Sequence, residues 1–386
     1  MIIQNISLLL FIVTPIIMFL VYQKFGKDKK PSVNIIQHPP EGINSLKTAA
    51  WFNGFVDYHA VISLIVHLAN KGYLNIKETS EWFGSAFKLI KCKDYNGKNK
   101  ASKTLMKTLF GSDTTELYLH EITNKQCRSI IQIKKKSTMN KKSGHKVYTK
   151  ESLCAEKIIY AFVFILEFVL WFAVCPHLIK TPLEIIIVIY FESFFAALTF
   201  FFEKTIKYLV FNLKRKKPII GKVTELLIIS IATVIVLFIA KDYFLPFVEP
   251  TLTTLIIFVT GVCSILSLII LKQFIRKRNN NAQMIYEEIL GFKMFLETAE
   301  DKELVCLYKE NPNYFYEMLP YAYALNLENE WLARNQNIEL AQPIWFSSEN
   351  TFSNDTIKSS IFGMLTFLVS IIKSRIRHGY HRAPLF

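Results

Sequence analysis

The chain has 386 residues, of which 51% are hydrophobic and 14% aromatic, and it contains 32 phenylalanines. This composition exceeds what a soluble domain needs for its core and favours a membrane protein, while the 20% of charged residues leave room for aqueous parts. The formal net charge of +15 fits membrane topology, anionic lipid or nucleic acid, and six cysteines without CxxC spacing argue against disulfides and against a zinc site.

Five apolar runs in the chain are long enough to cross a bilayer as helices. The first run, Ile6–Tyr22, has no charged residue before it and no small-residue cleavage site after it, so it predicts a membrane anchor and not a removed signal peptide. The other runs lie at about residues 158–179, 183–202, 223–240 and 251–271. The sequence therefore predicts a mainly α-helical, polytopic membrane protein with about five transmembrane helices.

Lysine and arginine gather in the loops on one side of these spans. The basic stretches are KFGKDKK after the first span, KTIKYLVFNLKRKKP between the third and fourth, and KQFIRKR after the fifth. The opposite loops, HLIKTP and KDYFLPFVEP, carry one lysine each. Because basic loops stay on the cytoplasmic side, the N-terminus is expected outside and the large aqueous segments inside. The predicted location is the cytoplasmic (inner) membrane.

The spans divide the chain into membrane and cytoplasmic parts. These are an N-terminal transmembrane anchor at 1–23, a basic winged-helix-like cytoplasmic insert at 24–156, a transmembrane hairpin at 157–203, a basic cytoplasmic loop at 204–222, a second transmembrane hairpin at 223–271, an α-helical cytoplasmic region at 272–346 and a basic amphipathic tail at 347–386. The insert and the helical region are each short for an independent core, so we expect them to pack together.

The cytoplasmic insert has the sequence pattern of a small α+β module. Ser45 is expected to cap a helix that ends at Gly54, and Asp57 is expected to cap a second helix that ends at Gly72. The strand-like stretches YLNIK and AFKLIK follow, and residues 102–110 predict another helix. Two short helices before a hairpin are typical of a winged-helix-like module.

A winged-helix-like module suggests a membrane-tethered DNA-binding regulator as one hypothesis. The helix before the hairpin would have to read bases in the major groove, but it offers His59, His67, Asn70 and Lys71 and no arginine or glutamine. Binding to nucleic acid is therefore not expected. The alternative is that the module packs on another cytoplasmic segment and that the basic run NKQCRSIIQIKKKSTMNKKSGHK faces anionic lipid headgroups.

The region after the last span contains two helical patterns and a tail. GFKMFLETAE and YFYEMLPYAYAL each place apolar side chains on one helical face, so both are expected in a core. Pro320 is expected to start or kink a turn, and Asn326 to end its helix in the left-handed conformation. The tail has an apolar stretch at 361–372 that is too short to span, followed by basic residues. It is expected either to lie on the inner membrane surface or to be a buried helix of the soluble part.

Several stretches of the chain resemble a known family. They are GKD at 26–28, PPEG at 39–42, NGFVDYHAVISLIVHLANKGYLNIKE at 53–78, GFKMFLETAE at 291–300 and LPYAYALNLENEW at 319–331. These stretches are similar to the YciQ-like predicted membrane proteins of bacteria, a family defined by a domain of unknown function. The family's usual extracytoplasmic β-sandwich is expected to be absent, because only Met1–Asn5 precede the first span.

The resemblance implies structural roles for the residues of these motifs. No catalytic pattern is visible among them, and they read as core positions and element ends. They are Gly26, Asp28, Pro39, Pro40, Gly42, Gly72, Tyr73, Gly291, Phe292, Glu300, Leu319, Pro320, Tyr321 and Trp331.

No catalytic, nucleotide-binding or metal-binding motif occurs in the sequence, so no enzymatic activity, cofactor or metal is expected. One acidic pair stands out, because Glu167 and Glu192 lie near the middle of the second and third spans and should sit at similar depth. The pair is either a proton or cation site or a neutral hydrogen-bonded pair that holds the hairpin together. The second interpretation is favoured, because no other polar residue lines a path.

The sequence thus favours a binding, scaffolding or signalling component with cytoplasmic interaction domains. Membrane lipids and a protein of unknown identity are the expected partners, and self-association into a homo-oligomer is a further option. The two alternatives are a proton- or cation-coupled membrane function centred on Glu167 and Glu192, and a membrane-tethered DNA-binding regulator.

Overall fold

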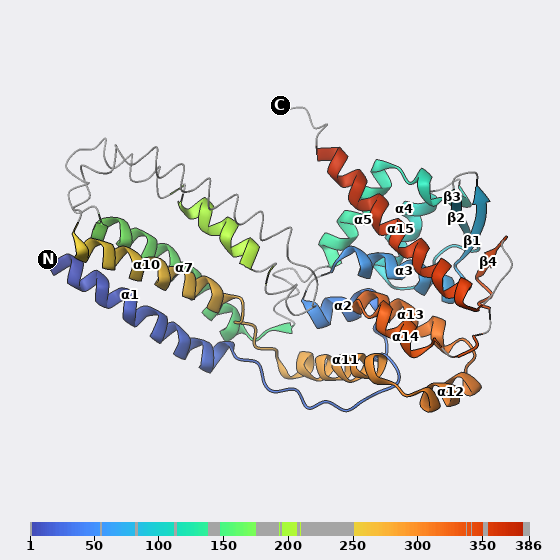
Figure 1. The fold of residues 1–386 in the computed structure, drawn as a ribbon, viewed down its shortest axis with the longest axis horizontal. Coiled ribbons are helices and arrows are strands. Elements are labelled where there is room, and N and C mark those ends of the chain that lie inside the picture. The colour runs from blue at the N-terminus through green and yellow to red at the C-terminus, as the bar shows by residue number, and fades with distance from the viewer. Residues whose placement is uncertain are drawn as a thin grey trace. The chain divides into compact units, whose positions relative to one another are not determined.

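The structure is a computed structural model of the chain. It describes residues 2–54, 56–81, 84–111, 114–137, 147–174, 193, 195–206, 209, 251–336, 338–340, 342–349 and 354–380. The chain forms two compact units, each built from segments that are far apart in the sequence (Figure 1). Unit 1 consists of Met1–Lys29 and Tyr148–Asn279, and unit 2 consists of Lys30–Val147 and Asn280–Phe386. The chain therefore passes between the units three times.

Unit 1 contains three long apolar helices that pack against one another (Figure 1). They are α1 (Ile2–Val21), which continues as the short π-helix η1 (Tyr22–Gly26), α7 (Lys150–Val174) and α10 (Leu252–Lys272). Their shared core includes the buried side chains Phe11, Ile159 and Leu268. At Gly261 the helices approach so closely that a Cβ atom would lie 2.6 Å from Leu170 Cδ1. Apolar side chains also cover the outside of the bundle, as lipid contact requires.

Three of the predicted spans correspond to described helices that are long and apolar enough to cross a membrane. Length and composition qualify Gln4–Gly26, Lys150–Val174 and Leu252–Lys272 as membrane spans, which correspond to the first, second and fifth predicted runs. The helix α7 begins earlier than the predicted 158, because Thr149 Oγ1 accepts a hydrogen bond from the Ser152 backbone N–H and caps it. The fourth predicted run lies outside the described residues. Of the third run, only residues 193 and 195–202 are described, and they are helical.

Unit 2 combines helices from both of its segments with a small mixed sheet. Its first segment supplies α2 (Ser45–Asn53), α3 (Tyr58–Asn70), β1 (Leu74–Glu81), β2 (Gly84–Lys91), α4 (Lys100–Phe110), β3 (Glu116–Tyr118), η2 (Leu119–Glu121) and α5 (Asn124–Ser137). Its second segment supplies α11 (Asn280–Thr298), α12 (Asp301–Glu310), α13 (Tyr314–Leu325), α14 (Glu328–Arg334), β4 (Phe346–Ser348) and α15 (Asn354–Tyr380).

The ends of the first helices follow local sequence signals. Asp57 Oδ1 accepts a hydrogen bond of 2.9 Å from the backbone N–H three residues on, and Gly72 has a φ of 67°, both as predicted. The predicted cap at Ser45 is wrong. Asn44 caps α2 instead, through a 3.0 Å hydrogen bond to Oδ1, because either neighbour can serve as a cap. Ser45 is buried and accepts a 2.8 Å hydrogen bond from the Ser63 hydroxyl.

The sheet has the strand order β3-β2-β1-β4. The strands β1 and β2 form the predicted antiparallel hairpin, and β3 extends it. The edge strand β4 comes from the other segment and pairs parallel to β1, with Phe346 opposite Ile76. The sequence patterns did not predict β4, because three residues are too few to show an alternation.

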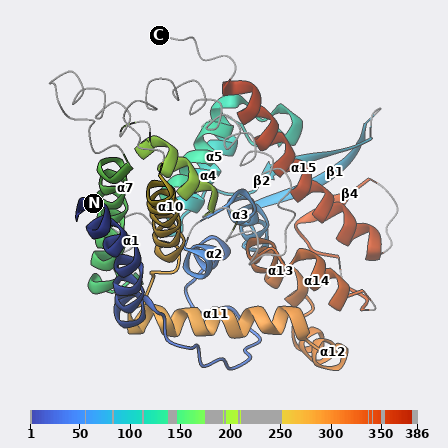
Figure 2. The same cartoon turned by 60° about the vertical axis from the view of Figure 1, so that its left-hand side comes forward.

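The two segments of unit 2 share one hydrophobic core, so the predicted packing of the insert on the C-terminal region is confirmed. The helices α3 and α13 lie side by side at its centre (Figure 2). Asn70 Nδ2 donates a hydrogen bond of 2.5 Å to the Tyr316 carbonyl oxygen between them. Every residue of α13 except the exposed Glu317 is buried, Pro320 included, so protein surrounds almost the whole helix and the proline does not end it. Asn326 follows it in the predicted left-handed conformation, with a φ of 59°.

The tail forms the helix α15. By length and composition alone Ile357–Arg375 also qualifies as a membrane span. However, its apolar face is part of the core of unit 2, where Ile361, Leu365 and Leu368 have no exposed surface. Its opposite face carries exposed small and polar residues such as Ser370, together with Phe367, which is 39% exposed. Protein contacts therefore occupy the surface that a membrane span would expose to lipid. Of the two expectations for the tail, the structure agrees with a buried helix of the soluble part.

Candidate functional site

Glu167 has a partner on the next helical segment of unit 1. Its carboxylate is buried in α7 and accepts a hydrogen bond from the Thr199 hydroxyl. Glu192, its predicted partner, lies outside the described residues. Thr199 follows Glu192 by seven residues in the sequence, a spacing that in a helix brings two residues to one face. This periodicity is the signal that would have added Thr199 to the predicted pair.

A second polar contact of unit 1 joins three of its helical segments. Lys272 Nζ, at the end of α10, lies 2.7 Å from Glu203 Oε1 and 3.7 Å from the centre of the Tyr160 ring. The lysine and glutamate side chains are 12% and 20% exposed, so water screens this ion pair only partly. No sequence pattern predicts this contact, because each residue stands in a different basic or apolar stretch.

The motif residue Asp28 lies at a point where three segments of unit 1 meet. Asp28 accepts a 2.8 Å hydrogen bond from the Arg278 backbone N–H and a second one from its guanidinium. The Arg276 N–H donates to the Gly26 carbonyl over 3.2 Å, and the Lys277 N–H donates to Ser152 Oγ over 3.0 Å. We call these three segments, Gly26–Asp28, 148–152 and 276–278, the junction. The places where the chain enters and leaves unit 1 are thus tied to one another.

Glycine at position 26 has a steric reason. A Cβ atom there would lie 2.9 Å from Tyr22 Cδ2 and 3.0 Å from Ile275 Cγ1, closer than packed carbon atoms allow. The basic stretch KQFIRKR, interpreted above as a topology signal, also supplies the arginine that binds Asp28. The GKD motif is therefore a structural motif of the junction.

The remaining motif glycines and prolines shape the chain of unit 2. A Cβ atom on Gly291 would lie 1.9 Å from the Asn34 carbonyl oxygen, so only glycine lets α11 touch this backbone segment. Gly42 has a φ of 68°, which favours glycine. Pro39 and Pro40 belong to the same extended segment. Tyrosine hydroxyls of α13 bind carbonyls on either side of the prolines, at Gln37 and Ile43.

The other motif residues lie in the core or at element ends of unit 2. Phe292, Leu319 and Trp331 have no exposed surface. The rings of Phe292 and Tyr321 meet edge to face, with centres 5.8 Å apart. Glu300 is the residue before α12 and makes no side-chain cap. Tyr73 donates a 2.6 Å hydrogen bond to Asn96.

All of the motif stretches except GKD lie within the range of a family match. The C-terminal domain of the predicted membrane protein family DUF2207 matches residues 36–334. The chain belongs to this family. No curated protein and no solved structure matches it. The DUF2207 match begins in unit 2, runs through the described helices α7 and α10 of unit 1 and ends in unit 2 again. It therefore covers most of the hydrophobic core of unit 2 but not the parts that β4 and α15 contribute.

Burial favours the neutral form of two titratable side chains in the core of this DUF2207 domain, Tyr321 and His67. Burial raises the pKa of Tyr321 to about 12, with a smaller effect of the Glu317 charge. It also lowers the pKa of His67 to about 4, and the charge of Lys71 adds to this. Within the described ranges, no group of three or more His, Cys, Asp or Glu side chains is arranged to hold a metal ion.

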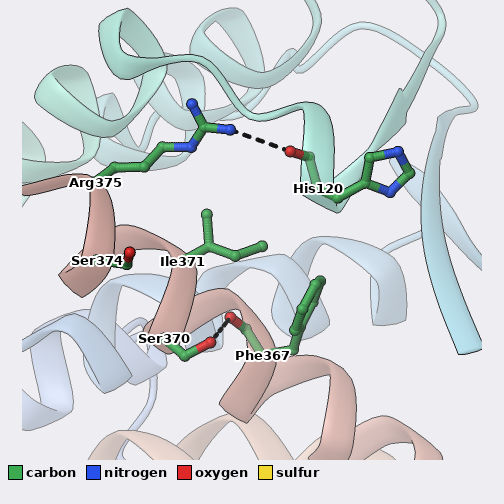
Figure 3. A pocket seen from close by; sticks show the side chains of 6 residues that line it. All are labelled: His120, Phe367, Ser370, Ile371, Ser374 and Arg375. Carbon is green, nitrogen blue, oxygen red and sulfur yellow. Dashed lines mark hydrogen bonds between the residues drawn. The ribbon is translucent and has the colours of Figure 1, made fainter. Parts of the chain in front are cut away.

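An open pocket of about 470 Å³ lies between α15 and the segment before α5. Its lining residues are His120, Phe367, Ser370, Ile371, Ser374 and Arg375. Figure 3 shows Phe367, Ile371 and Arg375 projecting from α15 toward the segment of His120. The Arg375 guanidinium donates a 3.2 Å hydrogen bond to the His120 carbonyl oxygen. The pocket combines an apolar wall with hydroxyls and one positive charge, and no motif of the family match lies in it.

Proposed function

We propose that this DUF2207 protein is a membrane-anchored binding protein that acts as a scaffolding or signalling component and has no enzymatic activity of its own. Unit 2 would hold a protein partner on the cytoplasmic side, and the spans would keep it at the membrane. The observation that carries the proposal is the sheet of unit 2, whose edge strands are much shorter than the strands they cover.

The central strands β1 and β2 have eight residues each. On the outer side of β1, β4 pairs only with Ile76–Glu78, and on the outer side of β2, β3 pairs only with Lys88–Ile90. Among the described residues, the rest of the hairpin has no neighbouring strand on either outer side. The Lys91 N–H donates to the Thr115 carbonyl oxygen over 2.7 Å. Strand edges without a neighbouring strand can pair with a strand of another protein. Ile344, two residues before β4, is 94% exposed and would add an apolar contact.

The junction supports a signalling role in addition to anchoring. It ties together the three places at which the chain passes from unit 1 to unit 2. A change in the packing of α1, α7 or α10 would therefore act on every connection to unit 2. A partner bound to unit 2 would in turn be coupled to the state of the spans.

Site-specific photo-crosslinking tests the binding proposal. A photoreactive phenylalanine analogue at Ile344 should give one recurring crosslinked product in native membranes. The same analogue at Glu310, an exposed position on α12, is the matched control and should not give it. Absence of a product at Ile344, or the same product from both positions, would contradict the proposal. A product with twice the 44.8 kDa mass would identify the partner as a second copy of the chain.

The topology part of the proposal is five spans in the inner membrane with the N-terminus outside. The described helices and the basic loops support it. Single cysteines near Thr181 and Phe247 should react with an impermeant thiol reagent in intact cells. Cysteines near Asn96 and Lys309 should react only after permeabilisation. Reaction near Asn96 in intact cells would contradict this orientation.

The likeness of the insert to a winged helix does not extend the proposal to nucleic acid. The elements α2, α3, β1 and β2 follow one another in the order of such a module. However, α3, which would have to enter the major groove, is buried from Ala60 to Val66 and again at Leu68 and Ala69. A helix packed in this way has no free face for bases.

The contact between Glu167 and Thr199 favours a second candidate, a proton- or cation-coupled membrane function. A carboxylate in a span that accepts a hydrogen bond from a hydroxyl is one component of a proton path. The contact equally fits a purely structural role, which remains the preferred interpretation. The variants Thr199→Val and Glu167→Gln separate the two.

A further inference from the structure

The helix α5 has a basic face that unit 2 leaves in contact with solvent. Its apolar side chains, Cys127, Ile130 and Ile133, are buried in the core. The opposite face carries four exposed basic residues, Lys125, Arg128, Lys135 and Lys136. Their spacing places them on one side of the helix. No acidic residue occurs between Asn124 and Ser137. One face of the helix is therefore positive along its whole length.

The end of α15 adds to the same surface, because α15 packs against α5. Lys373 is exposed, and the positive charges of Lys135 and Lys373 both act on Lys134. Lys134 itself turns inward, with its Nζ 4.1 Å from the centre of the Tyr58 ring. Several positive charges from α5 and α15 thus lie close enough to repel one another. We call Lys125, Arg128, Lys135, Lys136 and Lys373 the basic surface.

Among the described residues, no ion pair within 4.0 Å involves a member of the basic surface. The pocket of Figure 3 lies next to it, since its lining residue Arg375 binds the segment that leads into α5. The pocket offers the Ser370 and Ser374 hydroxyls beside the apolar Phe367 and Ile371. This combination of charge, hydroxyls and apolar side chains suits a charged headgroup at an interface with hydrocarbon.

The chain itself keeps unit 2 close to the bilayer. Unit 2 begins at Lys30, only four residues after η1 ends at Gly26, and it resumes at Asn280, eight residues after α10 ends at Lys272. An extended chain covers at most about 3.5 Å per residue, so the longer connection reaches about 28 Å. A surface tethered this closely meets lipid headgroups at a high effective concentration.

We infer that the basic surface of unit 2 docks on the anionic lipid headgroups of the membrane in which the same chain is anchored. Anionic lipids attract basic residues near the bilayer, and the attraction weakens as salt increases. Nucleic acid would also attract positive charge. The lipid assignment is favoured because the tether supplies a bilayer and because α3 is buried. The inference concerns a lipid surface and does not rest on the proposed protein partner.

Energy transfer in nanodiscs tests the inference with the full chain. A donor fluorophore is attached at Gln132→Cys, an exposed position between Arg128 and Lys135, and an acceptor is attached to lipid headgroups. Native cysteines other than the buried Cys127 are replaced by serine. Transfer should be greater in discs that contain phosphatidylglycerol than in phosphatidylcholine discs, and the difference should vanish at high salt. A donor at Glu310→Cys should show no such difference.

A charge-matched pair of variants isolates the basic surface. Glutamine at the four α5 positions, 125, 128, 135 and 136, should abolish the response to phosphatidylglycerol. Glutamine at Lys98, Lys100, Lys103 and Lys107, which are exposed in and before α4, changes the net charge equally and should leave the response intact. Equal loss in both variants, or transfer that ignores phosphatidylglycerol, would overturn the inference. Binding of duplex DNA would also overturn it, if the wild type in phosphatidylcholine discs bound DNA and only the α5 variant lost this binding.

Discussion

Asp28 and Arg278 are separated by 250 residues in the sequence and joined by two hydrogen bonds in the structure. One bond comes from the backbone N–H of Arg278 and the other from its guanidinium, so the carboxylate of Asp28 fixes both the chain and the side chain. The carboxylate side chain is 28% exposed and the arginine side chain 15% exposed. Charge-assisted bonds in such partial burial are stronger than surface ion pairs.

The first prediction follows from this contact. Asp28→Ala should destabilise unit 1 by about 1–3 kcal/mol, because it leaves two donors without their acceptor. Asp28→Asn should cost less, since its amide oxygen still accepts one of the two bonds. The measurement is the alkylation rate of a cysteine placed at the buried Ala155, in a background without reactive native cysteines. This rate should rise about 5- to 150-fold for the alanine variant.

Asp94→Ala is the control for the junction. Asp94 also forms an ion pair, with Lys91, but its side chain is 92% exposed. Water already solvates such a carboxylate, so its loss should change the rate little. An equal effect of both alanine variants would show that the junction has no special stabilising role.

The second prediction concerns Gly291 in α11. Gly291→Ala places a Cβ atom against the Asn34 carbonyl oxygen, which is backbone and cannot turn away. The helix and the extended segment must separate, so unit 2 should lose at least about 2 kcal/mol of stability. Gly363→Ala in α15 is the matched control. No atom lies within 4 Å of its Cβ position, so the gain in helix propensity should stabilise the protein by up to about 1 kcal/mol.

Denaturant unfolding followed by tryptophan fluorescence would measure both glycine variants. Trp51, Trp82, Trp331 and Trp345 all belong to the segments of unit 2, so the signal reports mainly on that unit. A Gly291→Ala protein as stable as the wild type would show that α11 does not need this close approach.

The sequence predicted most element ends of unit 2 and the packing of its two segments, but not the individual contacts between those segments. Asp57 and Gly72 act through hydrogen bonds and backbone angles within a few residues, so their roles are visible in a short window. The pairing of Ile76 with Phe346 joins strands from the two ends of the chain, and β4 is too short to carry a pattern of its own. The strand β4 forms because it can pair with the outer edge of β1.

The same limit applies to the candidate sites. Glu167 was predicted because a carboxylate is conspicuous in an apolar run, whereas the Thr199 hydroxyl is not. Asp28 belongs to the GKD motif, which predicts a structural role for it. Its partner Arg278 was hidden, because it stands among other basic residues that topology already explains. Sequence shows a polar group where its surroundings are apolar, and it hides one that has many similar neighbours.

The third prediction is a pH dependence of stability that His67 causes. Burial holds its pKa at about 4 in the folded protein, against 6.5 when unfolded. Above pH 6.5 both states are neutral and the stability is complete. As the pH falls from 6.5 toward 4, only the unfolded state takes up a proton, so up to about 3 kcal/mol should be lost.

Replacing the imidazole tests this assignment. His67→Gln cannot titrate, so its unfolding free energy should fall less than that of the wild type between pH 7 and pH 4.5, as measured by the same fluorescence assay. His120→Gln, at an exposed histidine, is the control and should follow the wild type. Parallel curves for wild type and His67→Gln would refute the role of His67.

The fourth prediction concerns α15 as a core helix. Leu365 has no exposed surface, so Leu365→Ala should leave a cavity and destabilise unit 2 by about 2–5 kcal/mol. Thr366→Ala, at the next and exposed position, should change stability by no more than about 0.5 kcal/mol. A transmembrane α15 would instead tolerate Leu365→Ala, since lipid would fill the space. Equal stabilities of the two variants would therefore contradict the buried position of the helix.

The fifth prediction separates the two interpretations of Glu167. In the structural interpretation, Thr199→Val removes the hydroxyl that Glu167 binds and should weaken unit 1 by about 1–2 kcal/mol. Thr199→Ser keeps the hydroxyl and should behave as the wild type. Glu167→Gln should also be stable, because its amide oxygen still accepts the Thr199 hydrogen bond. The alkylation rate of the cysteine at Ala155 would report all three effects.

A proton or cation site would give a different pattern with the same variants. Glu167→Gln removes the ionisable group and keeps the hydrogen bond. A site of this kind would therefore make wild-type liposomes discharge an imposed pH gradient and Glu167→Gln liposomes fail to do so, with equal amounts of folded protein. We expect no difference between these liposomes, together with a faster alkylation of Thr199→Val. If wild-type liposomes discharged the gradient and only Glu167→Gln abolished this, the structural interpretation would be wrong and a transport function would be supported.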